Sequence, residues 1–241
     1  MSIYEFPARV SYPDIDRQMQ LSAAGALRLM QEAAIVHADQ LGCCFRQVEK
    51  THFLWMLVGW HLRMEEPADW NDALTVKTWP RSLERVTSRR CFAIVREDGT
   101  LAAKADSAWI LVNADTHRAM RVTPEVAAML PLTEEDVFDA PFEPGALAEG
   151  VLTYEGEVLR RDLDTNDHVN NLIYLDYARQ ALPEALCACR IRELIIAYKR
   201  QLLLGDRFHC RYRKGEGCHK VEIYNEDETV LHCEVTLVLD E

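Results

Sequence analysis

The chain repeats one order of predicted elements twice, and this repeat constrains its fold more than any other feature. Each half reads as a strand, a short acidic loop, a helix and then a run of strands. Asp14-Ile15-Asp16 aligns with Asp162-Leu163-Asp164 at an offset of 148 residues, and the turn at 97–101 aligns with 226–230 at an offset of 129. Matches this short can arise by chance, but both lie at equivalent places in the two halves, which favours an internal duplication.

Hydrophobic periodicity and turn residues predict the elements of each half. In the first half we expect strands at residues 3–12, 53–63, 74–79, 86–96 and 101–113, with a helix that follows Ser22 and stops near Gly42. In the second half we expect strands at 151–160, 192–203, 207–213, 219–224 and 230–239, with a helix at 169–182 that Pro183 closes. One helix followed by several antiparallel strands is an α+β pattern.

A proline-rich stretch separates the two halves. Residues 123–150 contain Pro124, Pro131, Pro141 and Pro144 together with many acidic residues and little periodicity. A loop of that length without structure is unusual inside one domain. We therefore expect an N-terminal domain at 1–122, a crossover linker at 123–150 with a helical turn near 125–130, and a C-terminal domain at 151–241.

The chain of 241 residues has a net charge of −12, which argues against nucleic acid as a general partner because neutralising phosphates requires a basic face. Two local basic clusters are nevertheless present. One consists of Arg81, Arg85, Arg89 and Arg90, and the other of Lys199, Arg200, Arg211, Arg213 and Lys214. Such clusters are either solvated strand edges or a docking site for an acidic partner or a phosphate, and the sequence favours neither interpretation.

No pattern in the sequence predicts a metal site, a cofactor or a membrane span. The eight cysteines form no C-x-x-C pair, so we expect reduced and mostly buried thiols rather than metal ligands. The apolar run at 53–60 is far too short to cross a bilayer. The first residues lack the basic and apolar regions of a secretory signal, so a cytoplasmic location is the expectation.

Polar chemistry is concentrated in the loop from Arg161 to Asn171, which leads into the predicted helix of the second half. At the offset of 148 residues, Asn166 aligns with Gln18 and His168 aligns with Gln20. Only one half therefore has a histidine at the helix entrance, a difference that a purely structural repeat does not need. With Asn170 or a neighbour as its cap, the helix start would present backbone N–H groups to a developing oxyanion.

The run from Asp164 to Tyr174 resembles the D-x-N-x-H-V-N-N-x-x-Y signature of the acyl-acyl carrier protein thioesterases, enzymes with two hotdog domains in one chain. The resemblance implies an α+β fold of two tandem hotdog domains, each a curved antiparallel sheet wrapped around a long helix. It also implies that Asp164, Asn166 and His168 are catalytic. The family's Y-R-R-E-C pattern matches Tyr198-Lys199-Arg200-Gln201-Leu202, so Gln201 replaces a glutamate and Leu202 replaces a cysteine of the family site.

The implied activity is hydrolysis of the thioester of a fatty acyl-acyl carrier protein, which releases the free fatty acid and terminates chain elongation. Glutamine can hold a water molecule but cannot act as a base, so we expect His168 to activate the water and Gln201 to position it. Asn166 and the N–H groups of the helix start would stabilise the oxyanion, and Asp164 would orient His168 or the water.

The implied partner is acyl carrier protein with its phosphopantetheine-linked acyl chain. Val169 and Asn170, at the helix entrance, are expected to contact the substrate. In this family the acyl tunnel is associated with the N-terminal domain, whose site is degenerate. Candidate lining residues there are Leu27, Met30, Trp55 and Trp60, although an ordinary core position is the commoner role for any one of them.

Three other interpretations remain open at this point. The chain is alternatively a hotdog acyl-CoA thioesterase, a dehydratase that acts on a carrier-bound 3-hydroxyacyl chain, or a non-catalytic acyl-binding module. The signature loop favours hydrolysis over dehydration, and its retention in one half argues against the module. The protein is expected to be either a monomeric double hotdog or a homodimer.

Overall fold

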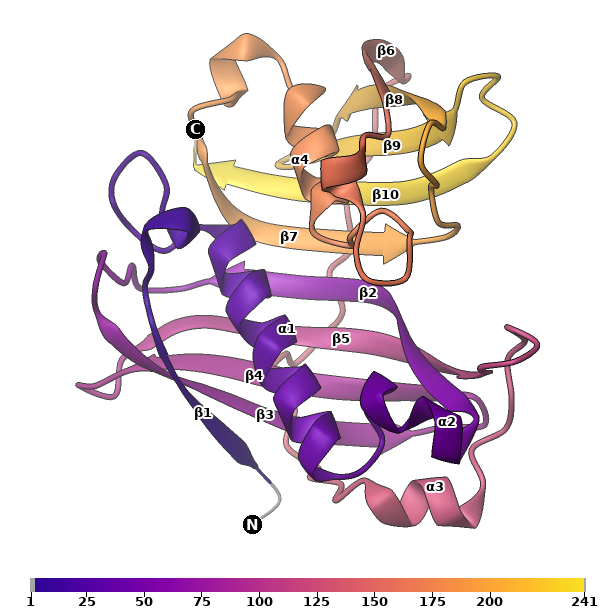
Figure 1. Cartoon of the computed structure of the whole chain (residues 1–241). Helices are drawn as coiled ribbons and strands as arrows, with labels where there is room; N and C mark the ends of the chain where they lie inside the picture. Colours follow the sequence, from indigo (N-terminus) through magenta and orange to yellow (C-terminus); the bar gives the residue numbers. More distant parts are fainter. Residues whose placement is uncertain (1–2, 241) are drawn as a thin grey trace. The chain divides into compact units, whose positions relative to one another are not determined.

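The computed structural model describes residues 3–240, and the chain divides into two compact units between Ala140 and Pro141 (Figure 1). The division falls inside the stretch 123–150 that the sequence marks as a crossover linker. Each unit consists of an antiparallel sheet with a helix across one of its faces.

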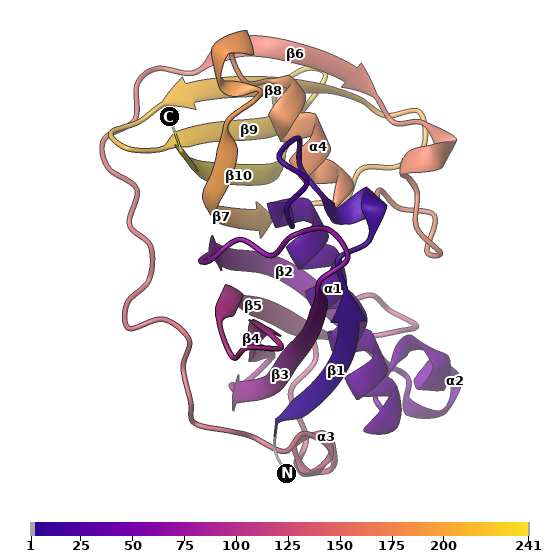
Figure 2. The ribbon, with the colours of Figure 1, turned by 90° about the vertical axis from the view of Figure 1, so that its left-hand side faces the viewer.

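The first unit contains one long helix and a sheet. Its elements are β1 (Tyr4–Arg9), α1 (Ala23–Gln40), α2 (Val48–Thr51), β2 (Phe53–Met64), β3 (Ala73–Leu83), β4 (Thr87–Arg96), β5 (Leu101–Asn113) and α3 (Pro124–Met129). The strands pair in the order β1-β3-β4-β5-β2, and these pairings are antiparallel. Because α1 contacts β1, β2, β3 and β4, the sheet wraps around this helix (Figures 1 and 2).

Local sequence determines both ends of α1. The Ser22 hydroxyl accepts a hydrogen bond from the Gly25 N–H at 3.0 Å and so caps the first turn. Glycine is required at position 25, because a Cβ there would lie 2.4 Å from the carbonyl oxygen of Asp14. After Leu41, Gly42 adopts a left-handed φ of 74°, which ends the helix where the sequence predicted.

The second unit repeats this plan with a shorter helix. Its elements are β6 (Val151–Glu157), α4 (Ile173–Gln180), β7 (Arg190–Tyr198), β8 (Arg207–Lys214), β9 (His219–Asn225) and β10 (Leu231–Asp240). The helix α4 lies against β9 and β10 (Figure 2). It buries Tyr174, Leu175, Tyr177 and Ala178 and exposes a narrow polar strip of Asp176, Arg179 and Gln180.

The two units share one topology. The strands of the second unit pair antiparallel in the order β7-β10-β9-β8-β6. When β6 to β10 are matched in turn to β1 to β5, this is the strand order of the first unit, and the helix lies between the first and second strands in both. The internal duplication predicted from two short sequence matches is confirmed.

Several predicted boundaries were wrong. The strands β1 and β6 each end three residues before the predicted end, and β3 runs to Leu83 rather than to residue 79. In the second unit, hydrogen bonds explain two further differences. The helix begins at Ile173 rather than at Val169, because the Val169 N–H donates to the carbonyl of Leu202 at 3.1 Å and not into the helix. The strand expected to run to residue 203 ends at Tyr198. The N–H groups of both Lys199 and Arg200 donate to the carbonyl of His232, at 2.8 and 3.1 Å, which breaks the regular ladder.

Part of the predicted linker packs on the first unit. Val126 and Leu130, in and after α3, join a buried cluster with Cys43, Phe53 and Leu111. The helical turn expected near 125–130 is therefore present and helps to close this end of the unit's core.

The residues that follow α3 also bind the sheet of the first unit. The indole N–H of Trp79 on β3 donates to the carbonyl of Glu135 at 2.9 Å, and Arg81 pairs with Asp136 at 2.8 Å. The ring of Phe138 stacks on His61 with centroids 3.8 Å apart. The stretch up to Phe138 is thus anchored to the first unit.

The eight cysteines are free thiols, and six of them are buried: Cys43, Cys44, Cys91, Cys210, Cys218 and Cys233. Burial raises the pKa of Cys91 and Cys210 to about 12, so both remain protonated packing residues at neutral pH. Among residues 3–240, no helix is long and apolar enough to cross a membrane.

Candidate active site

The signature residues lie on a tight loop that hydrogen bonds to itself. The Asp164 N–H donates to the carbonyl of His168 at 2.8 Å, which closes the loop. The Asp164 carboxylate accepts a hydrogen bond from the Asn166 N–H at 2.8 Å and a longer one from the Asn166 side-chain amide at 3.5 Å. Asp167 completes the turn in a left-handed conformation with φ of 59°. Asp164 therefore holds Asn166, and not the imidazole of His168.

A buried carboxylate anchors the base of this loop. The Asp162 carboxylate accepts hydrogen bonds from the Leu159 N–H at 2.8 Å and from the Tyr177 hydroxyl of α4 at 2.9 Å. Burial, reinforced by Asp162, raises the pKa of Tyr177, so the hydroxyl stays protonated and donates. The carbonyl of Asp162 also accepts from the Asn170 N–H at 2.8 Å, so both ends of the loop meet at this residue.

The segment that follows β7 pairs with the signature loop. His168 and Leu203 form an isolated antiparallel bridge, next to the bond from Val169 to Leu202. The Leu202 N–H donates to the Tyr174 hydroxyl at 2.8 Å. Gln201 immediately precedes Leu202, so the fold brings the segment containing Gln201 against the loop that contains His168.

Leu202, which stands where the family has a cysteine, is fully buried. Its side chain therefore belongs to the core, whereas Gln201 is exposed. Alternation along an extended segment explains why neighbouring residues face opposite sides.

The four predicted catalytic residues differ in their exposure and contacts. Asp164 and His168 are half-buried, and Asn166 and Gln201 are exposed. Among the described residues, the side chains of His168 and Gln201 have no hydrogen-bond partner, so both remain available to a substrate or to water. The structure thus brings Asp164 and Asn166 into contact and places His168 at the end of the same loop.

Four of the backbone N–H groups expected to face an oxyanion are occupied within the protein. Leu172 donates to the Asn170 side chain at 3.0 Å, and Ile173 donates to the Asn170 carbonyl at 2.9 Å. The N–H groups of Val169 and Asn170 make the bonds already described. Asn170 closes the turn that leads into α4, whose N-cap is Leu172 and has no side-chain capping bond.

The first unit contains the same loop with other side chains. Asp16 accepts a hydrogen bond from the Gln18 N–H at 2.9 Å, and its own N–H donates to the carbonyl of Gln20 at 2.8 Å. Met19 is left-handed with φ of 63°, as Asp167 is in the second unit. The alignment at an offset of 148 residues therefore describes two copies of one backbone conformation.

The candidate lining residues of the first unit occupy its interior. Leu27 and Met30 on α1 and Trp60 on β2 are buried, and Trp60 packs on Phe92 with ring centroids 5.1 Å apart. Trp55 is partly buried against the cluster that includes Phe53. These positions suit either a core or the wall of an acyl tunnel, so the lining role remains a prediction.

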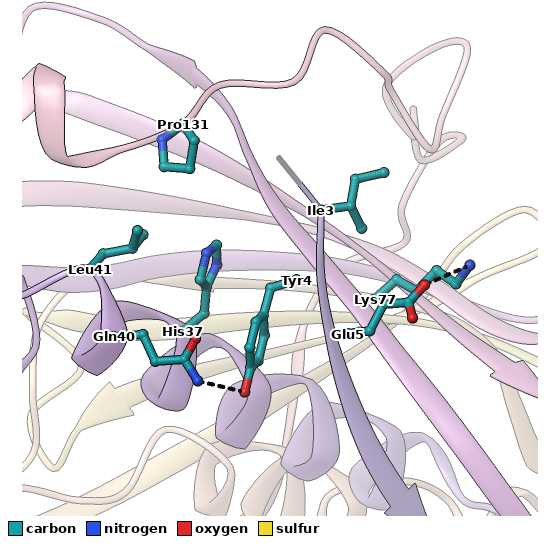
Figure 3. Close-up of a pocket in the computed structure, with 8 residues that line it drawn as sticks. All are labelled: Ile3, Tyr4, Glu5, His37, Gln40, Leu41, Lys77 and Pro131. Atoms are coloured by element: carbon teal, nitrogen blue, oxygen red, sulfur yellow. Dashed lines mark hydrogen bonds and ion pairs between the residues drawn. The ribbon is translucent and has the colours of Figure 1, made fainter. Parts of the chain in front are cut away.

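A pocket of about 840 Å³ lies near the end of α1, and its lining does not include the predicted residues (Figure 3). His37 stacks on Tyr4 there with centroids 4.9 Å apart, and Gln40 donates to the Tyr4 hydroxyl at 3.2 Å. The pocket is lined by Ile3, Tyr4, Glu5, His37, Gln40, Leu41, Lys77 and Pro131.

Part of the basic cluster near residue 90 belongs to the core, although Arg85 of this cluster is exposed. Arg90 is buried and bonds to His37 at 3.0 Å and to the Thr78 hydroxyl at 3.1 Å. Burial and the nearby guanidinium lower the pKa of His37 to about 4, so this imidazole is neutral and accepts the bond. Arg89 pairs with Asp106.

Sequence reasoning missed three groups that support the loop. Asp162 and Tyr177 anchor its base, and the Tyr198 hydroxyl donates to the Asn171 carbonyl at 2.9 Å. The alignment of Asp162 with Asp14 was a signal for the first of these, because Asp14 is the buried carboxylate of the other loop.

Within residues 3–240, no group of three or more acidic, histidine or cysteine side chains could hold a metal ion.

The sequence matches a known family along nearly its whole length. Residues 3–130 match the acyl-ACP thioesterase N-terminal domain, and residues 149–240 match the acyl-ACP thioesterase C-terminal domain. Solved structures with the same fold include an acyl-ACP thioesterase from Bacteroides thetaiotaomicron, with a TM-score of 0.88, 19% identity, and 99% of this chain and 98% of that chain covered. The 12:0-ACP thioesterase from Umbellularia californica gives a TM-score of 0.78 at 18% identity, over 100% and 98% of the chains. The tandem hotdog fold is thereby confirmed.

Relatives of this chain include plant enzymes. Oleoyl-acyl carrier protein thioesterase 2 from Arabidopsis thaliana is 27% identical over 198 residues, which are 74% of this chain and 54% of the relative. The dodecanoyl-[acyl-carrier-protein] hydrolase from Cinnamomum camphora is 26% identical over 201 residues, 77% of this chain and 52% of the relative. The chain thus spans about half the length of these relatives. With both domains of the family present in order, the chain belongs to the acyl-ACP thioesterase family.

Proposed function

We propose that this protein hydrolyses the thioester of a fatty acyl-acyl carrier protein and releases the free fatty acid. The observation that carries the proposal is the loop of the second unit, on which Asp164 holds Asn166 and the imidazole of His168 has no hydrogen-bond partner among the described residues. The relatives named above act on oleoyl and dodecanoyl thioesters of acyl carrier protein, which supports this class of substrate.

In the proposed reaction, His168 accepts a proton from a water molecule whose oxygen attacks the thioester carbon. The carbonyl oxygen becomes an oxyanion, and the second proton of the Asn166 amide is the donor that stabilises it. When the carbon–sulfur bond breaks, the imidazolium returns its proton to the leaving thiolate. The reaction thus consumes one water and one thioester and releases one carboxylic acid and one thiol, and His168 is neutral again.

Asp164 acts in this proposal through Asn166. Its carboxylate fixes the backbone and the side chain of Asn166, which orients the amide before substrate binds. Gln201, exposed on the neighbouring segment, would hold the attacking water by hydrogen bonds. Val169 and Asn170 would border the thioester, and Leu27, Met30, Trp55 and Trp60 would line the acyl chain in the first unit.

The test is release of free thiol from dodecanoyl- and oleoyl-acyl carrier protein by the wild-type chain and by His168→Ala. The variant should lose ~10²- to 10⁴-fold in turnover, the range for removal of a general base, while its thermal midpoint stays close to the wild-type value. Near-normal turnover by His168→Ala would remove the histidine from the mechanism. No hydrolysis by the wild-type chain with acyl groups of any length would refute the proposed function.

A further inference from the structure

Exposed arginines and leucines border the signature loop on both sides. Leu159, Arg160 and Arg161 precede the loop, and Arg200, Leu203 and Leu204 lie on the segment that pairs with it. The three leucines are 44%, 45% and 44% exposed, high values for large apolar side chains. We call these six residues the arginine–leucine surface.

Backbone hydrogen bonds place the two parts of this surface beside each other. The Val158 N–H donates to the carbonyl of Asp206 at 2.9 Å, and the Gly205 N–H donates to the carbonyl of Val158 at 3.1 Å. The residues just after Val158 and just before Gly205 are therefore neighbours, and the bridge between His168 and Leu203 joins them to the loop. The surface is continuous with the site of the proposed reaction.

Two of the three arginines of this surface lack the carboxylate partners that other cations of the second unit have. Elsewhere Lys199 pairs with Glu234 at 2.9 Å, Arg207 with Glu226 at 2.8 Å, Arg211 with Glu228 at 2.6 Å and Arg213 with Glu222 at 3.2 Å. Among the described residues, Arg160 and Arg200 have no ion pair. Arg161 makes a longer one, with its Nε 3.8 Å from Asp162, and its side chain is 83% exposed.

Most carboxylates near this surface accept hydrogen bonds from N–H groups of the protein itself. Asp162 and Asp164 accept hydrogen bonds within the loop, and Asp206 accepts one from the Leu203 N–H at 2.8 Å. Asp167 is the exposed acid of the loop. These carboxylates keep their charge, but Asp162 is buried and Asp164 and Asp206 are half-buried. The three arginines are exposed and therefore present the outermost charge of this surface, on a chain whose net charge is −12.

We infer that the arginine–leucine surface binds an acidic acyl carrier protein beside the loop that carries His168. This inference rests on the proposed function. An acidic protein is repelled by most of a chain with a charge of −12, so the exposed arginines beside the loop orient its approach. The leucines supply the apolar contact that desolvates the centre of such an interface. Arginine pairs with carboxylates bidentately, which suits a partner rich in aspartate and glutamate.

The first unit provides an internal contrast. At the offset of 148 residues, Tyr12 and Pro13 stand where the second unit has Arg160 and Arg161. Tyr12 is exposed, yet this copy of the loop has no cation at either position. Between Tyr12 and Ser22 this copy has one arginine, the exposed Arg17, where the second copy has two adjacent ones. The carrier is therefore expected to approach the loop that has the histidine rather than the other copy.

The test compares two double variants with the same change in net charge. Arg161→Glu/Arg200→Glu reverses two charges of the surface, and Arg192→Glu/Lys214→Glu reverses two exposed charges elsewhere in the second unit. With dodecanoyl-acyl carrier protein, the first variant should raise KM by ~10-fold or more and leave kcat nearly unchanged, and the second should match the wild type. With dodecanoyl-pantetheine, which has no protein partner, both variants should match the wild type.

Equal losses on both substrates would overturn the inference, because they would mean damage to the loop. Equal losses in both variants with the carrier substrate would do the same, because they would mean a general charge effect.

Docking is also measured without turnover, by calorimetric titration of the wild type and both variants with the apo carrier protein. If the wild type binds this protein and hydrolyses neither substrate, the proposed function fails and the docking surface stands. If all three bind it equally, the docking surface fails.

Discussion

The acidic loop occurs twice in this chain, with one backbone and two sets of side chains. In both copies an aspartate accepts a hydrogen bond from the N–H two residues ahead: Asp16 from Gln18 at 2.9 Å, and Asp164 from Asn166 at 2.8 Å. The aspartate is present in both copies, whereas the histidine is present in one. Residues present in both copies maintain the loop conformation, and residues present in the second copy alone are candidates for its chemistry. The primary role of Asp164 is therefore structural.

The two copies also differ in how their bases are held. In the first unit the buried Asp14 forms an ion pair with Arg28 of α1, and in the second the buried Asp162 accepts from Tyr177 of α4. Both carboxylates also accept a backbone N–H three residues earlier, at 3.2 and 2.8 Å. A charged and a neutral partner thus support the same turn, so the anchoring carboxylate matters more than the nature of its partner.

Exchange of the residue that most distinguishes the copies should have the largest effect. His168→Gln copies Gln20 into the second loop and removes the proposed base, so kcat/KM for an acyl-acyl carrier protein should fall by ~10³-fold, within the range for general-base catalysis. The fold should persist, because the first loop accommodates glutamine at this position. The measurements are steady-state kinetics and the thermal midpoint.

The reverse exchange, Gln20→His, is the control, and it should leave kcat/KM unchanged. An equal loss of activity from Gln20→His would show that the first loop takes part in the reaction. Activity retained in His168→Gln would contradict the assignment of chemistry to the second copy.

The Asn166 amide should have the next largest effect. Asn166→Ala removes the donor proposed for the oxyanion and should lower kcat by ~10²-fold, as loss of one such donor does elsewhere. The change in KM should be small, because the bond strengthens only as the oxyanion forms. Gln18→Ala, at the matching place in the first copy, should leave kcat as it is. A change in KM alone for Asn166→Ala would indicate ground-state binding instead.

The sequence predicted the fold and the loop well, because both depend on local patterns that occur twice. Alternation of apolar residues located the strands, and Gly42 marked the end of α1. Burial of Arg90 beside His37 could not be foreseen, since it depends on α1 packing over β3 and β4. The same holds for the occupied N–H groups at the entrance of α4, because the partner of Val169 is Leu202, distant in the sequence.

The shared aspartates should have equal effects on stability and unequal effects on turnover. Asp16→Ala removes the acceptor of the Gln18 and Gln20 N–H groups, and Asp164→Ala removes that of the Asn166 N–H. Each should lower the free energy of unfolding by ~1–2 kcal/mol, the usual cost of losing such a cap. Only Asp164→Ala should also lower kcat, by releasing Asn166. The free energy of unfolding of both variants is measured by chemical denaturation, and their kcat by steady-state kinetics at the same temperature. If neither variant lost stability, the aspartate would not be the residue that makes the loop.

Gln201→Glu should give the smallest effect and tests how far the site depends on a second base. Gln201 is exposed, and its side chain has no hydrogen-bond partner in the described chain, so glutamate is accommodated without loss of a contact. A carboxylate also accepts hydrogen bonds from water, so kcat should stay within about threefold of the wild type or rise.

In a His168→Gln background, Gln201→Glu should restore part of the lost activity if a base at either place can activate the water. Gln201→Leu is the control, because it is similar in size and cannot bind water. Loss of activity in a folded Gln201→Glu protein would show that the amide donates a hydrogen bond that a carboxylate cannot replace. Gln201 would then not position the attacking water in the way proposed.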